Sequence, residues 1–264
     1  ASESDIVIAA LGENPTLCGE ARERKGIRLP GDQERFLQDL IATGKPVVLV
    51  MFGGRPQVID NVADGCAAIL QAWYPGEEGG NAVADILLGN VNPSGKLCMS
   101  YPKNEDKTMI CYNNGGSTVD VAYPFGYGLS YTTFEYSDVV VPHSSGIKSD
   151  DLEVKCTVKN TGSVPGTEIV QLYVSPSSGQ PLKPIQLKGF ARVFLQAGES
   201  KTLSFHVSPQ QLAYYSEGQW VVEPGDYEFK IGASSSDIRL KGICKLTGEP
   251  RKMDYRDIYF STVD

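Results

Sequence analysis

The stretch that decides the fold is DIVIAALGENPTLCGEARERKGIRLPGDQERFLQDLI, residues 5–41. It opens with an apolar run, residues 5–11, which is typical of a strand buried on both faces of a parallel sheet. Apolar residues at helical spacing within 36–41 close it. The connection between them, residues 11–30, is rich in ionisable groups, and loops longer than about 12 residues in compact domains are usually functional or disordered. Strong structural signals on both sides favour a functional loop.

The same alternation of strand and helix continues outward from this stretch. Residues 47–52 and 68–73 are further apolar runs, and residues 82–88 form another helical pattern. This order predicts an α/β domain with a mostly parallel sheet and flanking helices. The loops after its strands emerge at the carboxyl edge, where ligands bind in sheets of this kind. Three strands make a small sheet, so we expect the first half of the domain to lie elsewhere.

The composition changes after the irregular, Gly- and Pro-rich segment that ends near residue 130. Several short runs then alternate with period two, and turn signals separate them: residues 151–158, 168–174, 188–194, 201–207 and 225–231. This pattern indicates an all-β immunoglobulin or fibronectin-like sandwich. We therefore divide the chain into an α/β part with a connector (1–130), a sandwich (131–247) and a C-terminal tail (248–264), which we expect to pack on another surface.

Composition excludes several classes of function. The 24 Lys and Arg against 32 Asp and Glu give a net charge of −8, which argues against a nucleic-acid partner. No apolar run approaches the roughly 20 residues of a membrane span. His143 and His206 are the two histidines, so a His-based metal site is not expected. The six cysteines show no C-x-x-C pair, and we expect free, mostly buried thiols rather than disulfides.

Carboxylates in the loop are the remaining candidates for chemistry. Glu13, Glu20 and Glu23 lie there among three arginines and one lysine. One reading is a solvated loop with ion pairs worth under about 1 kcal/mol each. The other is a general acid/base carboxyl that protonates a leaving oxygen. Glycoside hydrolysis by retention needs a second carboxyl about 5–5.5 Å away, and one loop rarely supplies both.

The motifs of this chain resemble those of glycoside hydrolase family 3, in its second and third domains. The loop motif is GEARERKGIRLPGDQ (19–33), followed by WYPGEEGG (73–80), NPSGKL (92–97) and PFGYGLSY (124–131). The sandwich carries VKNTG (158–162), GTEIVQLY (166–173) and LKGF (187–190), which resemble the fibronectin type III-like domain of the same enzymes.

The resemblance implies roles for individual residues of the loop. Glu20 matches the family's general acid/base, and Arg24 matches the motif arginine that braces the loop. Glu23 stands where the family usually has Asp, and Ala21 replaces a common Gly. Glu13 is the alternative acid.

The resemblance also implies that part of the active site lies outside this sequence. The family's nucleophile is an Asp on an N-terminal (β/α)₈ barrel, so we expect that barrel as the partner of this chain, which alone should be inactive. The expected activity is that of a retaining exo-β-glycosidase, a β-glucosidase in the first instance. Its substrate is a β-linked glucoside or oligosaccharide, and no metal or organic cofactor is required.

Several alternatives stay open at this stage. The sequence does not separate β-glucosidase from β-xylosidase specificity. A non-catalytic carbohydrate-binding or scaffold fragment is the rival from another class. A homo-oligomer is left open, and the resemblance favours a periplasmic or secreted protein.

Overall fold

The computed structural model describes residues 1–264 except 23, 107–109, 114–120, 150 and 177–184. The chain forms two compact units. The α/β unit comprises residues 1–91, 99–110 and 117–123, and the sandwich unit comprises residues 92–98, 111–116 and 124–264.

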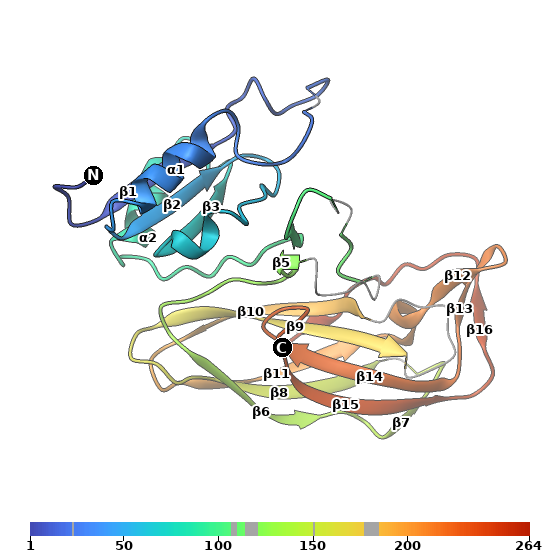
Figure 1. The fold of residues 1–264 in the computed structure, drawn as a ribbon. Coiled ribbons are helices and arrows are strands. Elements are labelled where there is room, and N and C mark those ends of the chain that lie inside the picture. Colours follow the sequence, from blue (N-terminus) through green and yellow to red (C-terminus); the bar gives the residue numbers. More distant parts are fainter. Residues whose placement is uncertain (23, 107–109, 114–120, 150, 177–184) are drawn as a thin grey trace. The chain divides into compact units, whose positions relative to one another are not determined.

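The α/β unit is built on a three-stranded sheet in the order β1-β2-β3, with both pairings parallel. Its strands are β1 (Val7–Gly12), β2 (Val47–Phe52) and β3 (Ala68–Trp73), and its helices are α1 (Gln33–Ile41) and α2 (Gly79–Leu87) (Figure 1). A short 3₁₀ turn, Ala63–Gly65, precedes β3. The predicted strands and helices thus occur where the sequence places them. The parallel layer is small, however, and the chain as a whole is mostly β.

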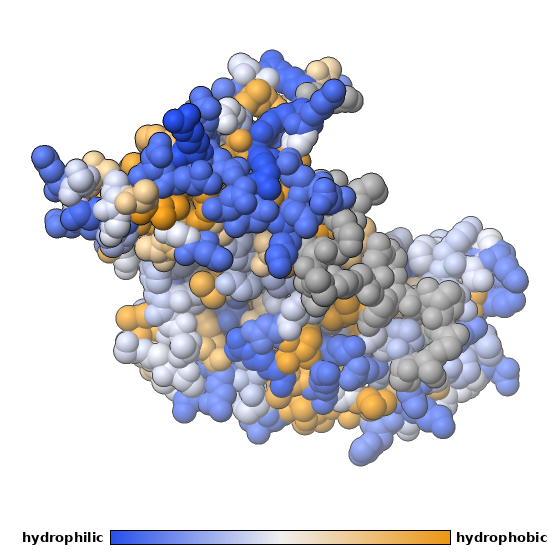
Figure 2. All heavy atoms as spheres, viewed as in Figure 1, coloured by the Kyte–Doolittle hydropathy of each residue, from blue (hydrophilic) through white to orange (hydrophobic). Residues whose placement is uncertain are grey.

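The strands differ in burial, and here one expectation was wrong. Every residue of β2 from Val47 to Met51 is buried, as predicted for a central strand. In β1, by contrast, Ile8 is 56% exposed, as is the preceding Ile6 at 52%, while Ala9 is buried. Because successive side chains of a strand point to opposite faces, one face of β1 is covered and the other is open. Exposed apolar residues also appear in orange among the polar ones on the face of the molecule drawn in Figure 2.

Helix α1 shows the same partial burial. Leu37 is fully buried, but Phe36, which we expected on the same covered stripe, is 52% exposed. The stripe is therefore narrower than its sequence pattern suggests.

Aromatic residues link the sheet to a short antiparallel pair, β4 (Tyr101–Pro102) with β5 (Val121–Tyr123). Trp73 and Tyr101 meet edge to face at 6.1 Å between ring centroids. Trp73 adopts a φ of 54°, which is rare for a bulky side chain. This conformation lies at the carboxyl end of β3, beside the loops described below.

The sandwich unit has one five-stranded and one four-stranded sheet, in the orders β10-β9-β14-β15-β7 and β17-β11-β8-β6, and a small sheet, β12-β13-β16 (Figure 1). Its strands are β6 (Phe134–Val140), β7 (Ser144–Gly146), β8 (Leu152–Asn160), β9 (Gly166–Pro176), β10 (Gln186–Leu195), β11 (Ser200–Val207), β12 (Tyr214–Ser216), β13 (Gln219–Val222), β14 (Gly225–Gly232), β15 (Ile238–Thr247), β16 (Arg251–Met253) and β17 (Thr262–Val263). A 3₁₀ turn, Pro209–Leu212, follows β11.

Alternation of side chains along these strands builds the sandwich core. Val154, Cys156, Leu172, Phe205 and Phe229 are among its buried members. Burying each large apolar side chain stabilises the fold by about 1.5–3 kcal/mol. The five predicted strands are all present as β8, β9, β10, β11 and β14, whereas the remaining strands of the unit were not foreseen.

The C-terminal tail contributes strands to two sheets. β16 pairs with β13, and β17 pairs with β11. The backbone N–H of Ser261 also donates to the carbonyl of Lys188 in β10, at 2.8 Å. Residues 251–253, 261 and 262–263 of the tail thus make backbone contacts with the sandwich.

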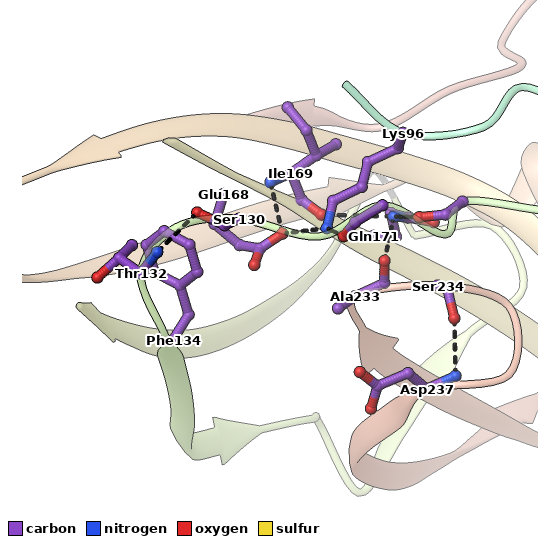
Figure 3. Close-up of polar contacts among 12 residues, drawn as sticks. Lys96, Ser130, Thr132, Phe134, Glu168, Ile169, Gln171, Ala233, Ser234 and Asp237 are labelled. Carbon is purple, nitrogen blue, oxygen red and sulfur yellow. Dashed lines mark hydrogen bonds and ion pairs between the residues drawn. The ribbon is translucent and has the colours of Figure 1, made fainter. Parts of the chain in front are cut away.

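Two of the motifs are held on β9 by a buried polar clamp, shown in Figure 3. Lys96 forms an ion pair with Glu168 at 3.1 Å and donates to the carbonyl of Gly128 at 2.8 Å. Gln171, which is 3% exposed, donates to the carbonyl oxygens of Gly126 and Ala233 at 3.0 and 2.7 Å. The segments 92–97 and 124–131 are thereby fixed to the sandwich.

The cysteines correct a second expectation. All six are free, but only Cys156 and Cys244 are buried, and Cys98 and Cys111 are exposed. Among the described residues, no helix is long and apolar enough to cross a membrane.

Candidate active-site loop

The loop begins where the carboxyl ends of the three strands meet. The N–H of Glu13 donates to the carbonyl of Phe52 at 2.9 Å, and the N–H of Gly53 donates to that of Trp73 at 3.2 Å. Gly12 has a φ of 136°, and a Cβ there would lie 1.8 Å from the Phe52 oxygen. Glycine is therefore required at Gly12, and it fixes the starting point of the loop.

One side chain closes the base of the loop. Gln33, the first residue of α1, accepts from the N–H of Gly12 at 2.7 Å and donates to its carbonyl at 3.0 Å. The start of the loop and the start of the helix after it are thus joined by a two-point contact. The intervening residues project from a closed base.

Glu13 anchors the inner part of the loop. It is 4% exposed, and its Oε1 accepts from Arg24 Nη1 at 2.8 Å. Its Oε2 lies 3.0 Å from Arg55 Nε, an ion pair without hydrogen-bond geometry. Arg24 also donates to the carbonyl of Arg28 at 2.5 Å. A buried carboxylate is tolerated only when it is paired, and here two arginines provide the pairing.

Arg28 anchors the outer part of the loop. Its guanidinium lies 2.7 Å from Asp60, 3.1 Å from Glu105 and 3.4 Å from Glu34. The hydrogen bond from Arg28 lowers the pKa of Asp60. These groups are partly exposed, so each pair is worth only about 0–1 kcal/mol. Together they hold the C-terminal part of the loop against the three segments that carry Glu34, Asp60 and Glu105.

Glu20 lies at the tip, apart from these anchors. It is exposed and makes no hydrogen bond or ion pair with any described residue. Arg22 donates to the carbonyl of Pro15 at 2.5 Å and closes the tip. Ala21 has a φ of 56°, in the left-handed region. Glu23 lies outside the described residues.

Of the three predicted site residues that the structure describes, Glu13 and Arg24 contact each other, and Glu20 lies apart from them. Sequence reasoning missed Arg55, which contacts Glu13 and donates to the carbonyl of Leu17 at 3.2 Å. It also missed Cys18, whose pKa is lowered by hydrogen bonds from Tyr74 and Arg55. Their positions in the sequence could have indicated these contacts, because Arg55 and Tyr74 come shortly after the ends of β2 and β3, at the same carboxyl edge of the sheet as the loop.

This arrangement can present an unpaired carboxyl on a loop with a fixed base. Such a group can donate or accept a proton at a bound molecule. Among the residues that the structure describes, no group of His, Cys, Asp and Glu is arranged to hold a metal ion.

Comparison with known proteins agrees with the motifs. Residues 1–131 match the model of the glycosyl hydrolase family 3 C-terminal domain, and residues 168–235 match that of the fibronectin type III-like domain. A beta-xylosidase from Formosa agariphila is 37% identical over 259 residues, covering 92% of this chain and 36% of the relative. A periplasmic beta-glucosidase from Salmonella typhimurium is 35% identical, covering 90% and 34%.

Solved structures show the same relationship. The beta-glucosidase from Listeria innocua in complex with glucose matches with a TM-score of 0.88 and 34% identity, covering 94% of this chain and 37% of that protein. The chain thus spans a little over a third of the length of these relatives. Because residues 1–131 and 168–235 match these two domain models, the chain belongs to glycoside hydrolase family 3 and consists of its C-terminal domain followed by a fibronectin type III-like domain.

Proposed function

We propose that this chain supplies the general acid/base of a retaining exo-β-glycosidase, and that Glu20 is that residue. The observation that carries the proposal is the contrast between two glutamates of one loop. Glu13 is buried and engaged by Arg24 and Arg55, whereas Glu20 is exposed and unpaired among the described residues. A carboxyl that must meet a glycosidic oxygen has to be accessible, which favours Glu20 over Glu13.

In this mechanism Glu20 first acts as an acid and then as a base. It protonates the departing oxygen while an Asp nucleophile forms the glycosyl-enzyme, and it then deprotonates the water that releases the sugar. The nucleophile belongs to the N-terminal barrel that we propose as the partner of this chain. This chain alone is then inactive, because it holds one carboxyl of the pair.

The substrate of this proposal is a β-linked glucoside or oligosaccharide. Two relatives that are named beta-glucosidases support this choice, one from Salmonella typhimurium and one from Listeria innocua. β-Xylosides are the second candidate, because a relative with 37% identity is named a beta-xylosidase.

The test uses the enzyme that joins this chain to its N-terminal partner. Glu20→Gln should lower kcat/KM on an unactivated β-glucoside by about 10²–10⁴-fold, because proton transfer is lost. With a 4-nitrophenyl β-glucoside the loss in the glycosylation step should be smaller, because that leaving group needs little protonation. Azide should restore turnover and give a β-glycosyl azide, since a small anion can replace the water that Glu20 activates.

Glu3→Gln is the matched control, because Glu3 is an exposed glutamate that precedes β1 in the same unit, away from the carboxyl edge of the sheet. It should leave both substrates unaffected. Wild-type activity in the Glu20 variant would sink the assignment, and so would an equal loss in both variants. Parallel assays with 4-nitrophenyl β-xyloside decide between the two sugars.

A further inference from the structure

An exposed tyrosine stands beside the loop and has no role in the proposed proton transfer. Tyr74 directly follows β3, at the same carboxyl edge of the sheet from which the loop starts. It is 58% exposed. Sites for small molecules are lined largely by apolar and aromatic side chains, with a few polar groups among them. An exposed aromatic ring next to a candidate acid is therefore a candidate contact for the substrate.

The ring of Tyr74 lies directly on the backbone of Gly54. A Cβ at Gly54 would be only 2.7 Å from Tyr74 Cε2, a distance that real Cβ atoms do not reach. The same Cβ would be 3.2 Å from Cys18 Sγ. Glycine at this position thus leaves the room in which the tyrosine ring and the loop cysteine meet.

The hydroxyl end of Tyr74 is also held. Its side-chain hydrogen bond with Cys18 raises the pKa of Tyr74 and lowers the pKa of Cys18. The ring is therefore fixed at one end by the loop and along one side by Gly54. Its remaining surface is free to meet another molecule.

The backbone around Tyr74 also restricts where its ring can point. Trp73 has a φ of 54°, which is rare for a bulky residue, and Pro75 favours extended conformations of the tyrosine before it. Trp73 packs on Tyr101, whereas Tyr74 remains exposed. Bulky residues held in such conformations are found preferentially at active sites and ligand contacts.

Cys18 connects this ring to the proposed acid. Only Gly19 separates Cys18 from Glu20, so the Cα atoms of the two residues are at most roughly 7 Å apart. In a retaining glycosidase the acid and the nucleophile flank the scissile bond, and the acid protonates the oxygen of the leaving group. Groups close to the acid therefore meet the leaving group rather than the sugar that forms the glycosyl-enzyme.

We propose that Tyr74 is a specificity-determining residue whose ring stacks against the leaving-group sugar of a β-linked oligosaccharide. This inference rests on the proposed function of Glu20. The face of an aromatic ring carries partial negative charge, which attracts the C–H groups on the face of a pyranose. Because the ring is already fixed, little conformational entropy is lost when the sugar binds.

The test uses the enzyme that joins this chain to its N-terminal partner and compares two substrates. Cellobiose has a sugar as leaving group, whereas β-glucosyl fluoride releases only a fluoride ion. Tyr74→Ala should lower kcat/KM for cellobiose about tenfold, because the stacking contact is lost, and leave kcat/KM for β-glucosyl fluoride unchanged. Tyr74→Phe keeps the ring and should retain most of the cellobiose activity.

Tyr255→Ala is the matched control, because Tyr255 is 74% exposed but lies in the tail. It should leave both substrates unaffected. The proposal fails if Tyr74→Ala lowers kcat/KM equally for both substrates, as a purely structural role would, or for neither. Failure of the proposed function gives a different result, because Glu20→Gln would then hydrolyse cellobiose at the wild-type rate.

A crystal structure of the same enzyme with a thio-linked analogue of cellobiose provides a measurement that requires no variant. A leaving-group ring within about 4–4.5 Å of the Tyr74 ring would support the proposal. A side chain of the N-terminal partner covering the Tyr74 ring in its place would overturn it.

Discussion

Two glutamates of one loop show how environment sets the role of a residue. Glu13 lies at the base of the loop, where burial requires that both of its oxygens meet cations. Glu20 lies at the exposed tip and has no such requirement. The same side chain therefore serves as an anchor at one position and is available for proton transfer at the other.

Ala21, beside Glu20, has a φ of 56°. It stands at the position where the family's similar motif commonly has glycine. An L-residue in this left-handed conformation costs about 1–2 kcal/mol, and glycine largely avoids that cost. We expect Ala21→Gly to stabilise the tip by about 1 kcal/mol. Hydrogen exchange of the backbone N–H of Arg22, which donates to Gly19 at 3.2 Å, would report slower local opening.

Ala84→Gly is the contrasting control, because Ala84 is an exposed residue within α2. Glycine there should destabilise the helix by about 1 kcal/mol. If both substitutions speed up exchange in their own segments, the tip does not hold Ala21 in the left-handed region.

At the scale of elements, Gln171 is the centre of the clamp on β9. Besides the bonds that it donates to Gly126 and Ala233, its Oε1 accepts from the Tyr173 hydroxyl at 2.5 Å. Gln171→Ala leaves two carbonyls and one hydroxyl without partners, and each buried unsatisfied group costs about 1–3 kcal/mol. We expect urea unfolding of the sandwich unit to show a loss of at least about 3 kcal/mol.

Gln219→Ala is the control for this prediction. Gln219 makes one exposed hydrogen bond, to Asp254 at 3.2 Å, so its loss should stay within about 0.5 kcal/mol. Similar unfolding midpoints for the two variants would mean that the clamp does not stabilise the sandwich.

Elements with a clear local pattern were predictable, and contacts between distant elements were not. The continuous apolar run of β2 located that strand, because a buried strand needs no alternation. The equally apolar β1 was predicted to be buried, but its burial depends on what covers its outer face. β15 was missed because Gly242 stands on its inward face and Ile243 on its outward face, which breaks the alternation of apolar and polar residues. In the loop, motif resemblance selected Glu20 and Arg24, whereas the pairing of Glu13 with Arg55 depends on how β1 and β2 align.

At the scale of the whole molecule, the open face of β1 favours association. Ile6 and Ile8 are both more than half exposed on it, and contiguous apolar surface promotes contact with other molecules. Ile8→Lys should weaken self-association of this chain by about tenfold, or about 1.4 kcal/mol. Sedimentation velocity over a range of concentrations measures the change.

In an enzyme that includes the proposed N-terminal partner, we expect the same substitution to be harmful. If the partner covers this face, Ile8→Lys should destabilise that enzyme, because it buries an unpaired charge. Val140→Lys is the control, since Val140 is exposed to the same 56% but lies on the sandwich. Equal effects of the two substitutions in both settings would contradict the idea that the β1 face is covered.

The tail also covers backbone groups at the border of the sandwich. β17 pairs with β11, and Asp264 and Ser204 exchange two backbone hydrogen bonds at 3.0 and 3.1 Å. The backbone N–H of Ser261 donates to a carbonyl oxygen of β10. Unpaired backbone groups at the border of a sheet can recruit a strand from another molecule. Because the tail pairs with backbone groups of β11 and β10, fewer of those groups are free to bind a strand of another molecule. We therefore expect residues 261–264 to oppose aggregation as well as to stabilise the fold.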